Sequence, residues 1–256
     1  MKSLSFFISF ALLTLFPIMA DAQSNIDAKR VKLGVFVSPS LSWMHPTTKK
    51  SSDNNFKTEG NGSKMGFTYG LMLDYQFADN YAFVTGLQGN LTGGRLRSER
   101  AGGAISEPSS VNAAEFDYNF NYIEIPAALK MRTEPIVAGM RLFGLAGLTL
   151  GINVAKKASY TVDYVDESGY VQVVSDEKVL LKGAFATAPV LLHMNIGAGA
   201  EMPLSDNLAA YAGIFFNNGF VPDVTNPNKY DLAYKGTFRD GNTRLNSFAL
   251  KVGIFF

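Results

Sequence analysis

The sequence predicts an all-β protein: an eight-stranded, antiparallel, up-and-down β-barrel that crosses a membrane with its strands. Eight segments alternate large apolar residues with small or polar ones, at the period of two that is typical of strands. Short and long connections alternate between these segments. The composition agrees, because 20 phenylalanines and 11 tyrosines accompany only 18% charged residues, fewer than the roughly 25% of soluble domains.

Residues 1–22 are predicted to be a cleaved secretory signal peptide, and residues 23–256 a single barrel domain. Lys2 precedes a short apolar run, and Ala20-Asp21-Ala22 has the small-x-small pattern of a cleavage site. A retained membrane anchor is the alternative, which Pro17 and the shortness of the run disfavour. There is no cysteine and hence no disulfide framework, and a net charge of +1 gives no indication of a nucleic-acid partner.

The clearest strand is 65–77, where all seven odd positions are apolar or aromatic. Its thirteen residues exceed the about five or six that are usual in soluble sheets and suit a tilted strand that crosses hydrocarbon. The same alternation predicts seven further strands, of which 208–217 is the least regular: 31–43, 81–93, 117–131, 139–153, 189–203, 208–217 and 244–256.

The connections between these strands differ in length according to a regular pattern. Three are short and turn-prone, at 78–80, 133–137 and 204–207. Four are about twenty residues or longer, at 44–64, 94–116, 154–188 and 218–243. Tight periplasmic turns and long extracellular loops are typical of barrels in the cell outer membrane, which is therefore the predicted location. Within the third long connection, 159–174 alternates around Glu167-Ser168-Gly169, which predicts a hairpin that continues beyond the membrane.

The apolar face of each strand is expected to meet lipid, because only a closed barrel satisfies its backbone there. A soluble barrel with reversed faces is the alternative, but its narrow lumen would have to hold every large side chain of 65–77. Phe248 and Phe256 lie on the apolar face of the last strand. They are predicted to form an insertion signal for the barrel-assembly machinery, with Phe256 in an aromatic girdle at the periplasmic rim.

The inward faces carry charged residues that are expected to pair. Unpaired charges in a narrow lumen are costly, so a hydrogen-bonded ion-pair network that plugs the barrel is predicted. A gated ion path, as in a narrow pore, is the alternative reading. The residues of this predicted network are Lys32, Asp74, Glu124, Lys130, Arg141, Glu201 and Lys251.

Two further groups of residues are candidates for binding or catalysis. Arg95, Arg97 and Arg100 open the second long connection, where they would contact lipopolysaccharide phosphates or lie in a solvated loop. His45 near Ser42 is the only pair that suggests a lipid A-modifying enzyme, and its spacing does not support one. We expect no enzyme activity, no cofactor and no metal site, since no cluster of ligating residues has the required spacing.

The stretch 121–133, "NYIEIPAALKMRT", resembles the fourth-strand signature of the PorT-like outer-membrane β-barrel family. The resemblance extends over the mature chain, to "VKLGVFVSPSLSW", "RLFGLAGLTLGI", "NIGAGAEMPLSDNL" and "NSFALKVGIFF". It implies the barrel fold and a role in protein secretion or envelope assembly, and it brings no catalytic motif. The expected function is a non-enzymatic envelope protein that acts through its extracellular loops or a partner complex, with membrane lipid and lipopolysaccharide as neighbours.

Overall fold

The computed structural model describes residues 30–47, 56–104, 106–107, 111–180, 188–222 and 243–256. The predicted signal peptide lies outside the described residues. No helix in the described part of the chain is long and apolar enough to cross a membrane.

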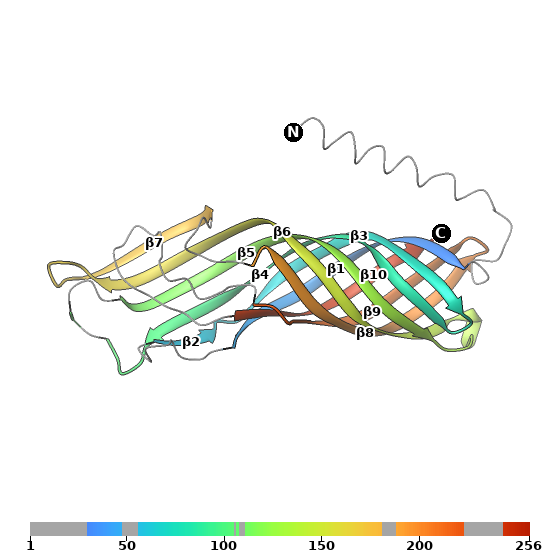
Figure 1. Ribbon diagram of the computed structural model, residues 1–256, viewed down its shortest axis with the longest axis horizontal. Helices are drawn as coiled ribbons and strands as arrows, with labels where there is room; N and C mark the ends of the chain where they lie inside the picture. Colours follow the sequence, from blue (N-terminus) through green and yellow to red (C-terminus); the bar gives the residue numbers. More distant parts are fainter. Residues whose placement is uncertain (1–29, 48–55, 105, 108–110, 181–187, 223–242) are drawn as a thin grey trace, which may run out of the picture.

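Eight long antiparallel strands close into a ring, and two further strands extend it at one end (Figure 1). The ring has the order β1-β3-β4-β5-β6-β8-β9-β10, and β10 pairs with β1 to close it. The fold-class prediction is therefore confirmed. The strands are β1 Val31–Pro46, β2 Phe56–Gly60, β3 Ser63–Ala78, β4 Tyr81–Arg100, β5 Val111–Arg132, β6 Arg141–Val165, β7 Val171–Leu180, β8 Val190–Ser205, β9 Leu208–Gly219 and β10 Thr243–Phe255.

The apolar face of each strand points outward, as the alternation predicts. Phe67, Leu71 and Ile254 are each 40% to 51% exposed, although they are large apolar side chains. The residues that follow Phe67 and Leu71, which are Thr68 and Met72, point inward and are buried. This arrangement rules out the soluble barrel with reversed faces and gives the ring a wall suited to lipid.

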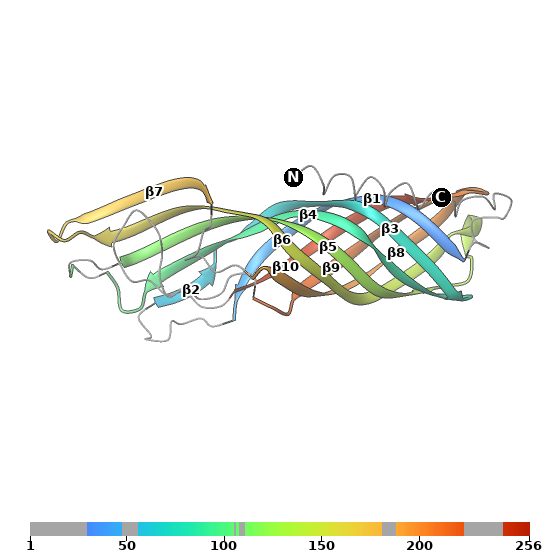
Figure 2. The same ribbon diagram turned by 45° about the horizontal axis from the view of Figure 1, so that its top comes forward.

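The strands on the two sides of the barrel differ in length at the outer end. At the end with short connections, strands meet through tight turns and one short 3-10 segment, η3 (Val137–Gly139). At the outer end, β4, β5 and β6 continue well past the ring, flanked by β2 and β7, and form the tall wall (Figures 1 and 2). The opposite side, made of β1, β8, β9 and β10, ends sooner and is the low wall.

The tall wall corrects the predicted loops. Much of 94–116 and 154–188 is strand, because β4 runs to Arg100, β5 starts at Val111 and β6 runs to Val165. β7 pairs with β6 across the turn at 166–170, so the predicted hairpin is confirmed. The physical reason for the correction is that these segments keep the period of two of a strand. Their outward face changes from apolar to polar, and their inward face changes from polar to apolar.

That exchange is clearest on β5. Its outward side chains are apolar from Met131 to Ile123 and polar from Asn121 to Glu115. Its inward side chains change in the opposite sense, from charged residues to a buried aromatic ladder: Phe116, Tyr118, Phe120 and Tyr122. A sheet in lipid is apolar outside, whereas a sheet in water packs its apolar face inward. The exchange at Asn121 therefore marks the outer boundary of the hydrocarbon region on this strand.

Candidate functional site

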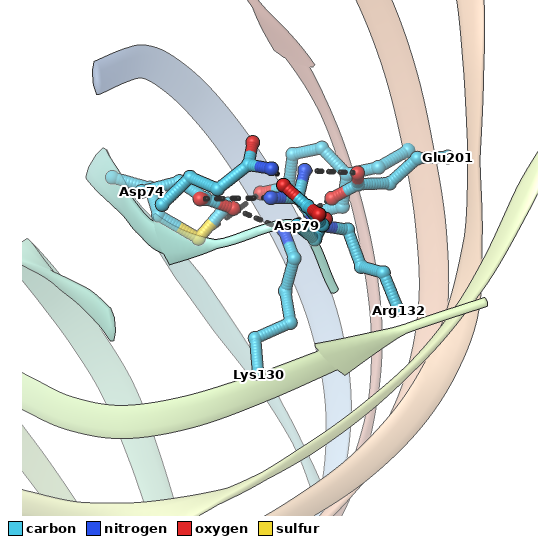
Figure 3. Close-up of polar contacts among 8 residues, drawn as sticks. Asp74, Asp79, Lys130, Arg132 and Glu201 are labelled. Atoms are coloured by element: carbon cyan, nitrogen blue, oxygen red, sulfur yellow. Dashed lines mark hydrogen bonds and ion pairs between the residues drawn. The ribbon is translucent and has the colours of Figure 1, made fainter. Parts of the chain in front are cut away.

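A balanced cluster of buried charges closes the barrel near the short-turn end. Asp74 on β3, Lys130 and Arg132 on β5 and Glu201 on β8 converge there (Figure 3). The Lys130 ammonium donates to both Asp74 and Glu201, and the Arg132 guanidinium lies 3.5 Å from Glu201 and 4.0 Å from Asp74. All four side chains are at most 6% exposed. Two cations thus neutralise two carboxylates, which is what a buried ion-pair cluster requires.

Two predicted members flank this cluster. Lys32 is buried on β1, directly opposite Asp74 in the β1–β3 ladder. Arg141, at the start of β6, is opposite Glu201 in the β6–β8 ladder and is half-buried. Arg132 is a member that sequence reasoning missed, because the strand was expected to end at residue 131. Its even number gives it the same parity as Lys130, so extending the strand by one residue would have found it.

Glu124 belongs to a separate polar group in the middle of the barrel. Its carboxylate accepts hydrogen bonds from Gln88 (2.5 Å) and Asn90 (2.8 Å) on β4, and His193 Nε2 on β8 lies 3.6 Å away. These groups line a cavity of about 40 Å³ together with hydroxyl side chains such as Ser38 and Thr149. A cavity of this size holds only two or three water molecules.

Lys251 differs from the expected network. Its ammonium lies over two inward-facing rings, Phe36 at 4.3 Å and Phe215 at 4.9 Å. It forms no ion pair with a carboxylate of the described residues. The structure therefore separates the seven predicted charges into an ion-pair cluster with two flanking residues, a polar group at Glu124, and a lysine held by aromatic rings.

The interior is filled in layers along its length. Above the ion-pair cluster lies an apolar layer that includes Phe36, Phe143 and Phe255. The polar group around Glu124 follows, and the aromatic ladder of β5 with Met44 and Leu245 packs above it. Side chains commonly fill the interior of an eight-stranded barrel in this way. Two cavities between these layers have volumes of only about 40 and 30 Å³.

The three arginines lie on β4 and not in a loop, and each of them already has an acceptor within the chain. Arg97 contacts Glu99 (2.6 Å) and Glu115 (2.7 Å), and these acidic partners raise the pKa of its guanidinium. Arg95 lies 3.1 Å from Asp117. Arg100 donates to the carbonyl oxygen of Val111. The strand pairing of β4 with β5 thus supplies acceptors for the donors expected to bind lipopolysaccharide.

The histidine and serine considered for catalysis lie on opposite faces of β1. Ser42 is fully buried and its hydroxyl donates to the carbonyl oxygen of Gly93 at 2.6 Å, whereas His45 points outward and is exposed. They therefore cannot act on one substrate atom. In the described part of the chain no group of three or more ligating side chains could hold a metal ion. Phe248 and Phe256 are both outward, and their role as an insertion signal stays a prediction.

Comparison with known proteins places the chain in a family. A family model described as "Outer membrane protein beta-barrel domain" matches residues 20–217. Neisserial surface protein A is similar in structure, at 12% identity and a TM-score of 0.39, over 88% of this chain and 97% of that one. OprG of Pseudomonas aeruginosa is similar at 9% identity and a TM-score of 0.40, over 90% and 98%. No curated protein sequence matches the chain.

The ring of strands, the lipid-suited wall and the filled lumen define an integral β-barrel protein of the cell outer membrane. The chain belongs to the outer membrane protein beta-barrel domain family.

Proposed function

We propose that this barrel is a non-enzymatic envelope protein that binds another protein through the tall wall, as part of a secretion or envelope-assembly complex. The observation that carries this proposal is the hairpin of β6 and β7 at the top of the wall. It projects from the barrel on the extracellular side, where a lipid-embedded protein meets other proteins (Figure 1).

The hairpin is acidic. From Lys157 to Leu180, the residues paired in this hairpin, there are five carboxylates, at positions 163, 166, 167, 176 and 177, against two lysines, Lys157 and Lys178. Glu167, Asp176 and Glu177 form no ion pair within the described residues. An anionic surface is repelled by the phosphate-bearing lipids of the outer leaflet and attracts a basic polypeptide. Charge therefore favours a protein partner over a lipid surface.

Apolar side chains are exposed beside these charges. Tyr170, Val171 and Val173 are each 63% to 69% exposed, although they lie beyond the lipid-facing band. Exposing these apolar side chains to water is unfavourable in free energy. A partner that covered the three side chains would bury their apolar area and gain that free energy. In the described part of the sheet β7 pairs only with β6, so its other edge has the backbone groups that an added strand uses.

The PorT-like resemblance supports the secretion or envelope-assembly part of the proposal. The family shown by the comparison is broader, and the finer assignment rests on the residues around 121–133. That segment forms the part of β5 that bears Glu124 and Lys130, so it specifies the barrel interior.

Site-specific photo-crosslinking in native outer membranes tests the proposal. A photoreactive residue at Val173 should give one discrete protein adduct, and one at lipid-facing Ile254 should not. Replacing Asp163, Glu167, Asp176 and Glu177 with lysine should abolish the adduct while the barrel still folds. An adduct that survives this charge reversal, or no adduct from positions 170, 171 and 173, would contradict the proposal.

A further inference from the structure

A cation that pairs with no carboxylate of the described residues lies on the outward face of the low wall. Arg244 is the second residue of β10, and its position is outward because it alternates with buried Thr243 and Leu245. Its Nε is shielded from solvent and has no hydrogen-bond partner, and no carboxylate of the described residues pairs with it. Arg244 as a whole is half-buried, and a shielded Nε–H without an acceptor is unfavourable, so an anion bound beside this guanidinium would stabilise it.

Two other donors adjoin Arg244 on the same face. His45 on β1 is its direct partner in the β1–β10 ladder, and residues paired in this way have Cβ atoms about 5 Å apart. Asn246 is the next outward residue of β10, and its side-chain oxygen accepts a hydrogen bond from Asn218 at 3.0 Å. The Asn246 amide nitrogen therefore remains available to donate. These three side chains form the donor group of the low wall.

An aromatic cluster lies directly below the donor group, toward the hydrocarbon. The rings of Trp43 and Phe248 are 5.5 Å apart, and those of Phe216 and Phe248 are 5.1 Å apart. Trp43 is paired with Asn246 across the ladder, so the aromatic and donor groups are adjacent rows of one surface. Aromatic side chains at this position are typical of the interface between headgroups and acyl chains.

Below the aromatic cluster, the outer wall has a shallow, open groove. It lies between Pro39 and Leu41 on β1 and Phe248 and Leu250 on β10, with Met65 at its side. The side chains that line it are almost entirely apolar. The groove continues the line of the donor group and the aromatic cluster, so the three features together have the chemistry of one amphipathic molecule.

From this arrangement we propose that the low wall binds a phosphorylated and acylated saccharide lipid of the outer leaflet, that is, lipid A. Arg244, His45 and Asn246 hold a phosphate, and an acyl chain lies in the groove below. The tall wall is the poorer site, because Arg97 and Arg95 there are paired with Glu115 and Asp117. This site is separate from the acidic hairpin, so the two proposals stand or fall independently.

The test is retention of named lipids by the purified full-length mature protein, measured by native mass spectrometry in detergent. The probes are monophosphorylated lipid A, the same lipid after dephosphorylation, and phosphatidylglycerol of equal chain length. Wild-type protein should retain monophosphorylated lipid A about tenfold more tightly than its dephosphorylated form, because charge-assisted hydrogen bonds are lost with the phosphate. The double variant Arg244→Gln with His45→Gln should erase this preference.

The matched control is Arg97→Gln, which removes an outward arginine whose partners are carboxylates of the chain and should leave the preference intact. Equal retention of the phosphorylated and dephosphorylated lipids by wild-type protein would overturn the phosphate site, and this comparison needs no variant to fold. Equal retention of phosphatidylglycerol and lipid A would overturn the choice of lipid. A preference that persists in the double variant would overturn the assignment to Arg244 and His45.

Discussion

Lys130 and Lys251 face the same barrel interior and have different surroundings. Lys130 is held by Asp74 and Glu201, whereas Lys251 lies over the rings of Phe36 and Phe215. A charge taken out of water is compensated well by a buried carboxylate and less well by an aromatic face, which contributes about 0.5–2 kcal/mol. The same substitution at the two positions should therefore have different effects.

The variant Lys130→Met should lose about 3–5 kcal/mol of unfolding free energy, because it leaves Asp74 and Glu201 buried with less compensating charge. Urea unfolding of the protein in lipid vesicles measures this, with fluorescence of Trp43, the single tryptophan, as the signal. Arg97→Gln is the control and should leave the midpoint unchanged, since its ion pairs are exposed. An unchanged midpoint for Lys130→Met would show that the cluster does not stabilise the barrel.

The variant Lys251→Met should keep or raise the unfolding free energy in the same assay. Methionine retains an unbranched stem for contact with the aromatic rings and removes a charge that has no carboxylate partner in the described barrel. A loss as large as that of Lys130→Met would mean that Lys251 is stabilised by a group other than the rings.

Among the elements, the β6–β7 hairpin depends on one carboxylate at its turn. Asp166 accepts hydrogen bonds from the backbone N–H groups of Tyr170 and Ser168, both at 2.9 Å, and from Gln172. The hydrogen bond from the Tyr170 backbone is the main cause of the lowered pKa of Asp166. A carboxyl whose pKa is lower in the folded state stabilises that state when ionised.

The turn should therefore be fully stable above the ordinary pKa of an aspartate, about 3.9, and should lose stability as pH falls through the lower folded-state value. Amide hydrogen exchange at Ser168 and Tyr170 measures this, and exchange corrected for its intrinsic pH dependence should accelerate in acid. Asp166→Asn should show faster corrected exchange at neutral pH, whereas the neighbouring change Glu167→Gln should not. Equal exchange in the two variants would exclude Asp166 as the stabilising group.

The elements also show where sequence reasoning succeeded and where it could not. All eight strands of the ring were predictable because lipid imposes a uniform apolar face, as in 65–77. Beyond Asn121 the inward residues of β5 are apolar and the outward ones polar or charged, so the predicted strand ended at residue 117 and residues 111–116 of β5 were expected to belong to a loop. A pattern search that allowed the faces to exchange would have found the tall wall.

The sequence pattern could not predict which inward residues of different strands contact one another. The inward parity of Lys130 and Glu201 was visible, but their contact depends on the stagger of β5, β6 and β8 around the ring. Alternation specifies which face of the sheet a residue lies on but not its position along the barrel axis. It could therefore not separate the ion-pair cluster from the Glu124 group, or predict that Lys251 lies over the rings of Phe36 and Phe215 at the edge of the Glu124 cavity.

For the molecule as a whole, the layered interior predicts that the barrel does not conduct ions. Charged, apolar, polar and aromatic layers follow one another along the axis, and two interior cavities between the described residues measure only about 40 and 30 Å³. Purified protein in planar bilayers should show no steady single-channel conductance at either polarity, with a water-filled porin as the positive control. Reproducible conductance steps that disappear in Lys130 or Glu124 variants would support the narrow-pore alternative.

The exchange of chemistry along β5 has a mechanical consequence for the assembled envelope. If the protein sank by two residues, Asn121 would enter hydrocarbon, and if it rose by two, Ile123 would meet water. Both displacements are unfavourable, so the barrel is held at one depth while the bilayer around it adjusts its thickness. The extracellular hairpin is consequently presented at a constant height above the membrane.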